Sequence, residues 1–164
     1  MVSNIHGDHF SIEQIKKLSP KKLYLNKECI EMLGEEDLPC EIKEVKVGES
    51  MDIDGITVSF FDVDHGPNVK VKPLENFGLL IKADNQTIYF AGDMFYPSGI
   101  DVTNLEVDYA LIPVGTFYVF GPQEAFEFVK TFKKIVKIIS MHYEKTPDTK
   151  NQFLELTRGV FESE

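Results

Sequence analysis

The stretch Asn4-Ile5-His6-Gly7-Asp8-His9 places three side chains that can bind a metal ion within four residues. Side chains so close in sequence cannot all point one way from a regular strand or helix, so a tight loop has to gather them. Gly7 gives the backbone of that loop conformational freedom. Imidazole and carboxylate groups together suit zinc, iron or manganese better than calcium, which prefers oxygen ligands. A polar N-terminal loop that holds two histidines by chance is the alternative interpretation.

Three further polar residues follow apolar stretches that are expected to be strands. His65 comes after the stretch 56–63, Asp93 after 87–90, and His142 after 135–141. The ends of strands are where a scaffold presents working side chains. Taken singly, Asp93 is equally suited to capping a turn, and a lone histidine is more often structural than a ligand.

Together these elements resemble the metallo-β-lactamase superfamily, especially its lactonase-like and metal-dependent hydrolase branch. That family carries H-x-H-x-D-H, then a lone His, then Gly-Asp, then a final His at the end of a strand. Residues 4–9, His65, Gly92-Asp93 and His142 follow this order. The resemblance extends from residue 1 to about residue 158, and the ordered set is far more specific than any one piece.

The resemblance implies an α/β fold, the layered αββα sandwich, with two metal sites. His6 and His65 would hold the first metal, Asp8, His9 and His142 the second, and Asp93 would bridge the two. Asp8 and Asp93 would be the catalytic carboxylates. The implied cofactor is zinc, as one or two divalent ions, with iron or manganese as alternatives. A hydroxide between the metals would attack a small ester, lactone or phosphoester, because metal binding lowers the pKa of water to roughly 7.

Two features depart from the family pattern. The first ligand histidine of the family is replaced by Asn4, whose neutral amide is a poor zinc ligand, so we expect a weakened first site. The family also has opening strands before this motif, which here begins at residue 4. The resemblance therefore implies one domain over residues 1–164, incomplete at its N-terminus, with low stability or a tendency to form homo-oligomers. A catalytically silent remnant of the fold, or an interaction domain that binds metal weakly, is the alternative function.

The composition agrees with a globular protein that acts on a small molecule. Apolar residues make up 43% of the chain and include thirteen Phe, enough for a packed core. The net charge of −10 disfavours a nucleic-acid substrate, including the one a nuclease of this superfamily would take. No apolar stretch is long enough to cross a membrane, and no secretion signal is apparent. Cys29 and Cys40 lie outside any CxxC pair and are expected to be reduced thiols, which favours the cytoplasm.

The order of expected elements also favours layered α/β architecture, because strands dominate first and then alternate with helices. Strands are expected at 22–25, 41–47, 51–53, 56–63, 77–82, 87–90, 109–114 and 135–141, and helices at 11–18, 27–33, from 122, and at 152–161. Asp54-Gly55 and Asp84-Asn85-Gln86 predict two hairpins. The aromatic segment 115–121 either lines a substrate pocket or belongs to the core. Asp64 and Tyr143 are candidates for supporting the metal ligands or contacting substrate, or are simply surface polar groups.

Overall fold

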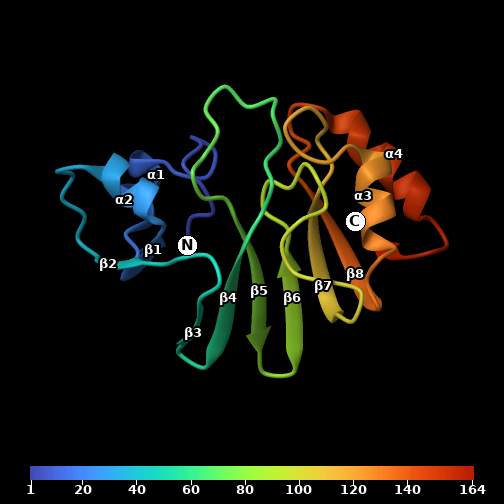
Figure 1. Ribbon diagram of the computed structural model, residues 1–164, viewed down its shortest axis with the longest axis horizontal. Coiled ribbons are helices and arrows are strands. Elements are labelled where there is room, and N and C mark those ends of the chain that lie inside the picture. The colour runs from blue at the N-terminus through green and yellow to red at the C-terminus, as the bar shows by residue number, and fades with distance from the viewer.

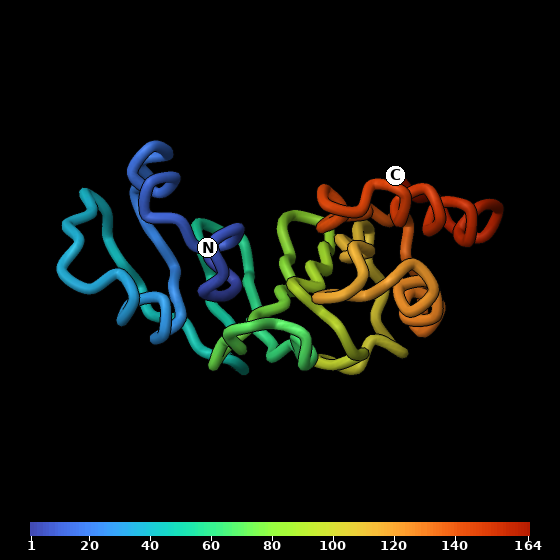
Figure 2. The backbone as a smooth tube through the Cα atoms, turned by 90° about the horizontal axis from the view of Figure 1, so that it is seen from above, coloured from blue at the N-terminus to red at the C-terminus, as the bar shows by residue number.

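The computed structural model describes residues 1–164 as a small parallel sheet followed by a large mixed sheet with helices (Figure 1). The N-terminal part contains α1 (Ile12–Leu18), β1 (Lys22–Leu25), α2 (Lys27–Leu33) and β2 (Glu41–Glu44). The larger part contains β3 (Ser50–Ile53), β4 (Ile56–Asp62), β5 (Phe77–Ala83), β6 (Gln86–Phe90), β7 (Glu106–Pro113), α3 (Pro122–Val129), β8 (Lys134–Met141), α4 (Pro147–Thr157) and β9 (Glu162–Ser163). The N-terminal part and the two C-terminal helices lie at opposite ends of the long axis (Figure 2).

The large sheet has the strand order β3-β4-β5-β6-β7-β8-β9. The hairpins β3–β4 and β5–β6 are antiparallel, as is the pair β4–β5, whereas β6, β7, β8 and β9 are mutually parallel. Because two antiparallel pairings separate β4 from β6, these two strands run in the same direction. The carboxyl ends of β4, β6, β7 and β8 therefore meet at one edge of the sheet, the upper edge in Figure 1.

The two faces of the large sheet have different surroundings. One face packs against α3 and α4 through a cluster of seventeen buried side chains that includes Tyr89, Ala110, Ile112, Phe128 and Phe153. The opposite face contributes Val58 and Phe60 to a smaller cluster, which Tyr24 of β1 joins from the N-terminal part. A third cluster fills the space between β1 and the two short helices. The alternation of side chains along each strand explains this division into layers.

Most of the expected elements, the two hairpins and the layered α/β class are confirmed. The bounds of the last helix were wrong: α4 spans Pro147–Thr157, not 152–161. Arg158 leaves helical geometry and Gly159 adopts a left-handed conformation, so Phe161 lies beyond the helix. Pro147 at the first turn is the start signal that fixes the true beginning. None of the helices combines the length and the apolar character needed to cross a membrane.

Candidate metal centre

A compact turn at the N-terminus holds His6, Asp8 and His9. The backbone N–H groups of His9 and Phe10 both donate to the carbonyl of His6, at 2.8 and 2.7 Å. Helix α1 follows at once, with the Ser11 hydroxyl accepting from the N–H of Gln14 as its N-cap. Gly7 does not have a positive φ, and a Cβ atom there would meet nothing within 4 Å. The expectation that this turn depends on the freedom of glycine was therefore wrong: backbone hydrogen bonds close it.

The other three candidate ligands emerge at the carboxyl edge of the large sheet. His65 follows β4, Asp93 follows β6 and His142 follows β8, and these three strands run in the same direction. His142 itself has a left-handed backbone, with φ of 58°, which turns the chain immediately after β8. A Cβ atom at Gly115, next to the end of β7, would lie 1.8 Å from the carbonyl oxygen of His142. Residue 115 has to be glycine for His142 to occupy this place.

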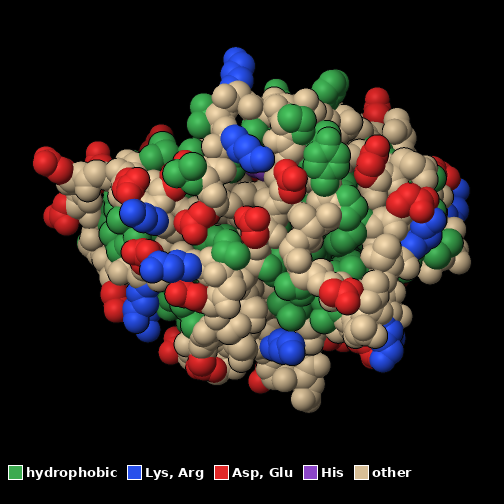
Figure 3. All heavy atoms as spheres, in the orientation of Figure 1, with side chains coloured by type: hydrophobic (Ala, Val, Ile, Leu, Met, Phe, Trp, Pro, Cys, Tyr) green, Lys and Arg blue, Asp and Glu red, His purple; other side chains and the backbone are tan.

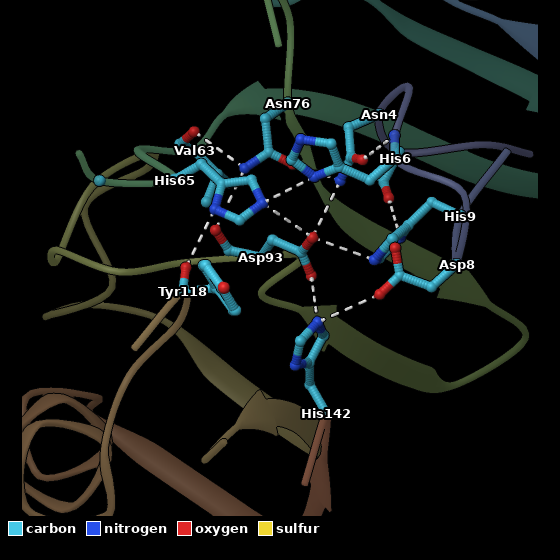
Figure 4. Close-up of polar contacts among 12 residues, drawn as sticks. Asn4, His6, Asp8, His9, Val63, His65, Asn76, Asp93, Tyr118 and His142 are labelled. Atoms are coloured by element: carbon cyan, nitrogen blue, oxygen red, sulfur yellow. Dashed lines mark hydrogen bonds and ion pairs between the residues drawn. The ribbon is translucent and has the colours of Figure 1, made fainter. Parts of the chain in front are cut away.

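All six predicted residues converge on one centre (Figure 4). They form two groups, each with ligand atoms within 4.8 Å of one another: His6, His65 and Asp93, and Asp8, His9 and His142. Asp93 lies between the groups. Its Oδ2 is 3.1 Å from His65 Nε2 and 3.0 Å from His9 Nε2, and its Oδ1 is 3.7 Å from His142 Nε2. His65 Nε2 is also 3.1 Å from His6 Nδ1, and His142 Nε2 is 3.5 Å from Asp8 Oδ2.

Three of the imidazole rings are anchored by the nitrogen that faces away from the centre. His65 Nδ1 lies 2.9 Å from the carbonyl of Tyr118, and His6 Nε2 lies 2.8 Å from the carbonyl of Val71. A carbonyl oxygen can only accept, so these two nitrogens carry the protons. His9 Nδ1 is 2.7 Å from the Ser3 hydroxyl. Anchoring of this kind fixes the tautomer and the ring orientation of metal-binding histidines.

Asp93 is the electrostatic focus of the centre, with a side chain only 2% exposed. Burial alone would raise the pKa of its carboxyl, but the His65 and His9 rings beside it outweigh burial and hold that pKa well below its ordinary value. Burial likewise tends to lower the pKa of His9 and of His65, and the hydrogen bond and charge of Asp93 raise both above their ordinary value. The centre therefore holds an ionised Asp93 carboxylate, beside which His9 and His65 keep a proton to higher pH than a free imidazole does.

The donor set fits a divalent cation. Asp93 Oδ1 is buried and accepts no hydrogen bond from the protein, although buried carboxylate oxygens are nearly always satisfied. Three separations lie at 3.0–3.1 Å, close to the roughly 3.3 Å between ligands of a tetrahedral zinc: His6 Nδ1 to His65 Nε2, His65 Nε2 to Asp93 Oδ2, and His9 Nε2 to Asp93 Oδ2. Imidazole nitrogens and carboxylate oxygens are donors that zinc, iron and manganese accept.

Several residues of the centre were not predicted from the sequence. Ser3 supports His9, and Asn76 lies 3% exposed with its side-chain amide donating to the carbonyls of Val63 and Asp93. The Oδ1 atom of Asp64 accepts from the N–H of Gly66 and closes the turn around His65, and its role in supporting a ligand or contacting substrate stays a prediction. The hydroxyl of Tyr143 accepts from Lys150 Nζ at 3.2 Å.

The aromatic segment 115–121 belongs to the core only in part, and its role in lining a substrate pocket stays a prediction. Phe120 is 1% exposed and belongs to the core, whereas Phe117 and Tyr118 are 69% and 44% exposed. The carbonyl of Phe117 accepts from Asn68 Nδ2, which ties the segment to the loop that follows His65. Only a small area of histidine is visible from this side of the molecule, in a hollow bordered by hydrophobic and charged side chains (Figure 3).

The layered fold and the convergent His and Asp side chains define a protein of the metallo-β-lactamase fold. Residues 1–142 match the family described as the Beta-lactamase superfamily domain, and the chain belongs to it. It is 28% identical to a UPF0173 metal-dependent hydrolase of Thermococcus kodakarensis over 90% of this chain and 67% of that relative. A second UPF0173 metal-dependent hydrolase, from Korarchaeum cryptofilum, is 29% identical over 95% of this chain and 69% of its own length.

Solved structures show the same fold at lower sequence identity. Igni18, a metallo hydrolase from the archaeon Ignicoccus hospitalis, aligns with a TM-score of 0.74 at 18% identity, covering 99% of this chain and 73% of that one. YhfI from Bacillus subtilis, a metallo-β-lactamase fold protein, aligns with a TM-score of 0.74 at 13% identity, covering 99% of this chain and 72% of the other. These structures show the same fold, and the family match over residues 1–142 confirms the resemblance inferred from the ordered motif.

Proposed function

We propose that this chain is a metal-dependent hydrolase of a small ester, lactone or phosphoester, with zinc as the first candidate metal and iron or manganese as alternatives. The observation that carries the proposal is the convergence of five ligand-type side chains around the buried Asp93 carboxylate, whose Oδ1 accepts no hydrogen bond. In the proposed assignment His6 and His65 hold one ion, Asp8, His9 and His142 hold the other, and Asp93 lies between them.

A divalent cation in such a site lowers the pKa of a water molecule and polarises a carbonyl or phosphoryl oxygen. The chain's own groups supply orientation and charge. The three anchored rings hold their free nitrogens toward the centre, and the Asp93 carboxylate is ionised before any ligand arrives. Asp8, whose side chain is 55% exposed, lies on the solvent side, next to His142. A substrate is therefore expected to approach from the side of Asp8 and His142.

The first measurement is the metal content per chain by elemental analysis, together with hydrolysis of ester, lactone and phosphodiester substrates. We expect one or two zinc, iron or manganese ions per chain, and a sharp loss in His142→Asn. Asparagine is used because it tolerates the left-handed backbone at this position better than alanine. Asp101→Asn, on the surface in a turn away from the centre, is the matched control and should keep the metal. Absence of stoichiometric metal after reconstitution would favour the catalytically silent alternative.

We further infer that the substrate carries an apolar group that packs on Phe117. This side chain is largely exposed, and its neighbour Tyr118 contacts the ligand residue His65 through its carbonyl. Phe117→Asn is expected to raise KM about tenfold for esters with an apolar acyl group, since loss of such a contact costs about 1.5 kcal/mol or more. Val160→Asn, an exposed apolar position after α4, is the control and should leave KM unchanged. An equal effect of both substitutions on KM would contradict this role of Phe117.

A further inference from the structure

Asn4 occupies the position where the family pattern has a ligand histidine, and its side chain is fully buried. Its Oδ1 accepts the backbone N–H of His6 at 2.9 Å. A backbone N–H can only donate, so this bond fixes which end of the amide is oxygen. Asn4 Nδ2 must therefore face the other way, where it lies 3.1 Å from Asp93 Oδ2 and 3.1 Å from Asn76 Oδ1 (Figure 4).

An amide NH₂ group offers two donors and no lone pair for a metal ion. With its nitrogen directed at Asp93 and its oxygen engaged by the His6 backbone, Asn4 has no free ligand atom. We propose that Asn4 is a positioning residue: it holds the Asp93 carboxylate and the His6–His9 turn in the arrangement that receives a metal, and it does not bind the metal itself.

Asn76 supports the same arrangement through hydrogen bonds to Asn4, Val63 and Asp93. Its Oδ1 accepts from Asn4, and its Nδ2 donates to the carbonyls of Val63 and Asp93 at 3.1 and 3.2 Å. Two buried asparagines thus connect the N-terminal turn, the end of β4 and the end of β6. Each of these three segments supplies proposed ligands, so the pair fixes their relative positions before any metal binds.

The pair also determines which oxygen of Asp93 remains available. Oδ2 accepts from Asn4 and lies beside the rings of His9 and His65, whereas Oδ1 is buried without a hydrogen bond and faces His142. Loss of the Asn4 donor would leave Oδ2 held only by the rings of His9 and His65, which themselves have to turn their Nε2 atoms to a metal. Where the family pattern has a ligand histidine, this chain therefore has Asn4, a hydrogen-bond donor that orients the Asp93 carboxylate between the two groups.

The inference is tested first without metal. In the metal-free protein, the side-chain NH₂ resonances of Asn4 are expected to be protected from solvent exchange, as a fully buried donor to a carboxylate would be. Rapid exchange of both protons would overturn the proposed contact. This measurement does not depend on the proposed function, because the exchange of the Asn4 protons can be measured even if the chain never binds a metal.

Metal affinity is the second test, measured by competition with a chromophoric chelator, with zinc and with cobalt. Asn4→Ala is expected to weaken binding about 10- to 100-fold, the usual effect of removing a group that orients a ligand. Asn76→Ala is expected to act in the same direction. Asn26→Ala is the matched control: Asn26 is equally buried, accepts the N–H of Cys29 and donates to the carbonyl of Glu75, but lies outside the centre.

Three outcomes separate the possibilities. Weaker affinity in Asn4→Ala with an unchanged cobalt absorption spectrum supports a positioning role, because the ligand set is the same. A changed cobalt spectrum would identify Asn4 as a ligand and overturn the proposal. Wild-type affinity in Asn4→Ala, with a melting temperature lowered as in Asn26→Ala, would reduce Asn4 to a structural residue and leave the proposed hydrolase function intact. If Asn4→Ala does not fold, the metal affinity of Asn76→Ala and the hydrogen exchange of the Asn4 side chain in the metal-free wild type still test the positioning role.

Discussion

At the scale of single residues, the centre is organised around one carboxylate. Asp93 lies between two groups of ligand-type side chains, and its ionised state is stabilised by His65 and His9 against the effect of burial. Each surrounding ring with an anchored distal nitrogen loses little further freedom when it binds a metal. A single substitution at Asp93 should therefore affect both proposed sites at once.

Asp93→Asn is expected to lower metal affinity at least about 100-fold, since a neutral amide replaces the shared carboxylate and removes the charge that faces the rings. Elemental analysis after dialysis against a weak chelator measures this. Asp108→Asn serves as the control, because Asp108 is half-buried and accepts the backbone N–H of Thr87 far from the centre. Retention of metal by Asp93→Asn, or equal loss in the control, would show that Asp93 is not the shared ligand.

The stability of the metal-free protein should depend on pH through the same contacts. The pKa values of His9 and His65 are raised above 6.5, so their contribution is complete below pH 6.5 and is lost as the pH rises through their folded pKa values. The pKa of Asp93 is lowered from 3.8, so its contribution is present above pH 3.8 and is lost only in stronger acid. The melting temperature of the metal-free protein is therefore expected to be lower at pH 9 than at pH 6. A flat profile over this range would contradict the ion pairs.

Metal binding should show the opposite dependence on pH. His9 and His65 have to lose the proton on Nε2 before they can bind a metal, so affinity should increase as the pH rises through their raised pKa values. Calorimetry in buffers of different ionisation enthalpy measures the protons released. We expect each bound ion to release protons at pH 6, up to one from the raised-pKa ring of its site, and fewer at pH 9. Release of none at pH 6 would mean that the rings are already neutral.

The residues that could be predicted from the sequence are those whose chemical type is itself the signal. His6, Asp8, His9, His65, Asp93 and His142 were found from type and order, and the structure brings them together. Asn76 gave no such signal, because an asparagine before an apolar strand is common and its partner Asn4 is 72 positions away. The carbonyl groups of Val71 and Tyr118 belong to the backbone, which every residue has. Supporting contacts of this kind follow from the fold and not from the local sequence.

At the scale of secondary-structure elements, the direction of the strands creates the centre. The carboxyl ends of β4, β6 and β8 share one edge of the sheet, and a proposed ligand follows each of them. The sequence predicted the strands and their ends, because apolar runs bounded by turn residues are strong local signals. It did not predict the sheet order, since the parallel β6–β7–β8 arrangement is set by packing of α3 and α4 over distant residues. The last helix was misplaced because its apolar side chains continue past Gly159.

A pair of glycine substitutions tests how the ends of β7 and β8 fit together. Gly115→Ala would place a Cβ atom 1.8 Å from the carbonyl oxygen of His142, so we expect a loss of at least about 2 kcal/mol of stability and a weaker metal site. Gly7→Ala, within the N-terminal turn, meets nothing within 4 Å and has no positive φ, so it should fold and bind metal normally. Thermal melts measure the stability of both variants, and metal titrations measure their affinity for the metal. Equal tolerance would show that the strand ends can separate without disturbing His142.

At the scale of the whole molecule, the centre joins two parts that have separate cores. The cluster around Leu25 and Cys29 lies within the N-terminal part, whereas the largest cluster lies between the big sheet and its helices. Tyr24 connects the two parts through the smaller cluster that it forms with Val58 and Phe60. The N-terminal part supplies three of the six proposed ligands and the large sheet supplies the other three. The sequence predicted the fold class, which is confirmed. A single domain over residues 1–164 and the tendency to form homo-oligomers stay predictions, because they depend on whether the two parts fold and unfold together.

Metal binding is therefore expected to stabilise the attachment of the N-terminal part. A ligand at about 100 times its Kd adds about 2.7 kcal/mol to stability, so zinc should raise the melting temperature and a chelator should lower it. Amide hydrogen exchange locates the effect: residues 1–10 should gain protection with metal, whereas β7, which carries no proposed ligand, should change little. Sedimentation and a single cooperative melt would support one domain, while two separate transitions in the metal-free protein that merge on adding zinc would show that the metal couples the parts. Equal protection throughout the chain with and without metal would mean that the two parts are already held together by contacts that need no metal, such as Tyr24, the Ser3–Phe77 backbone hydrogen bond and the Asn4–Asn76 hydrogen bond.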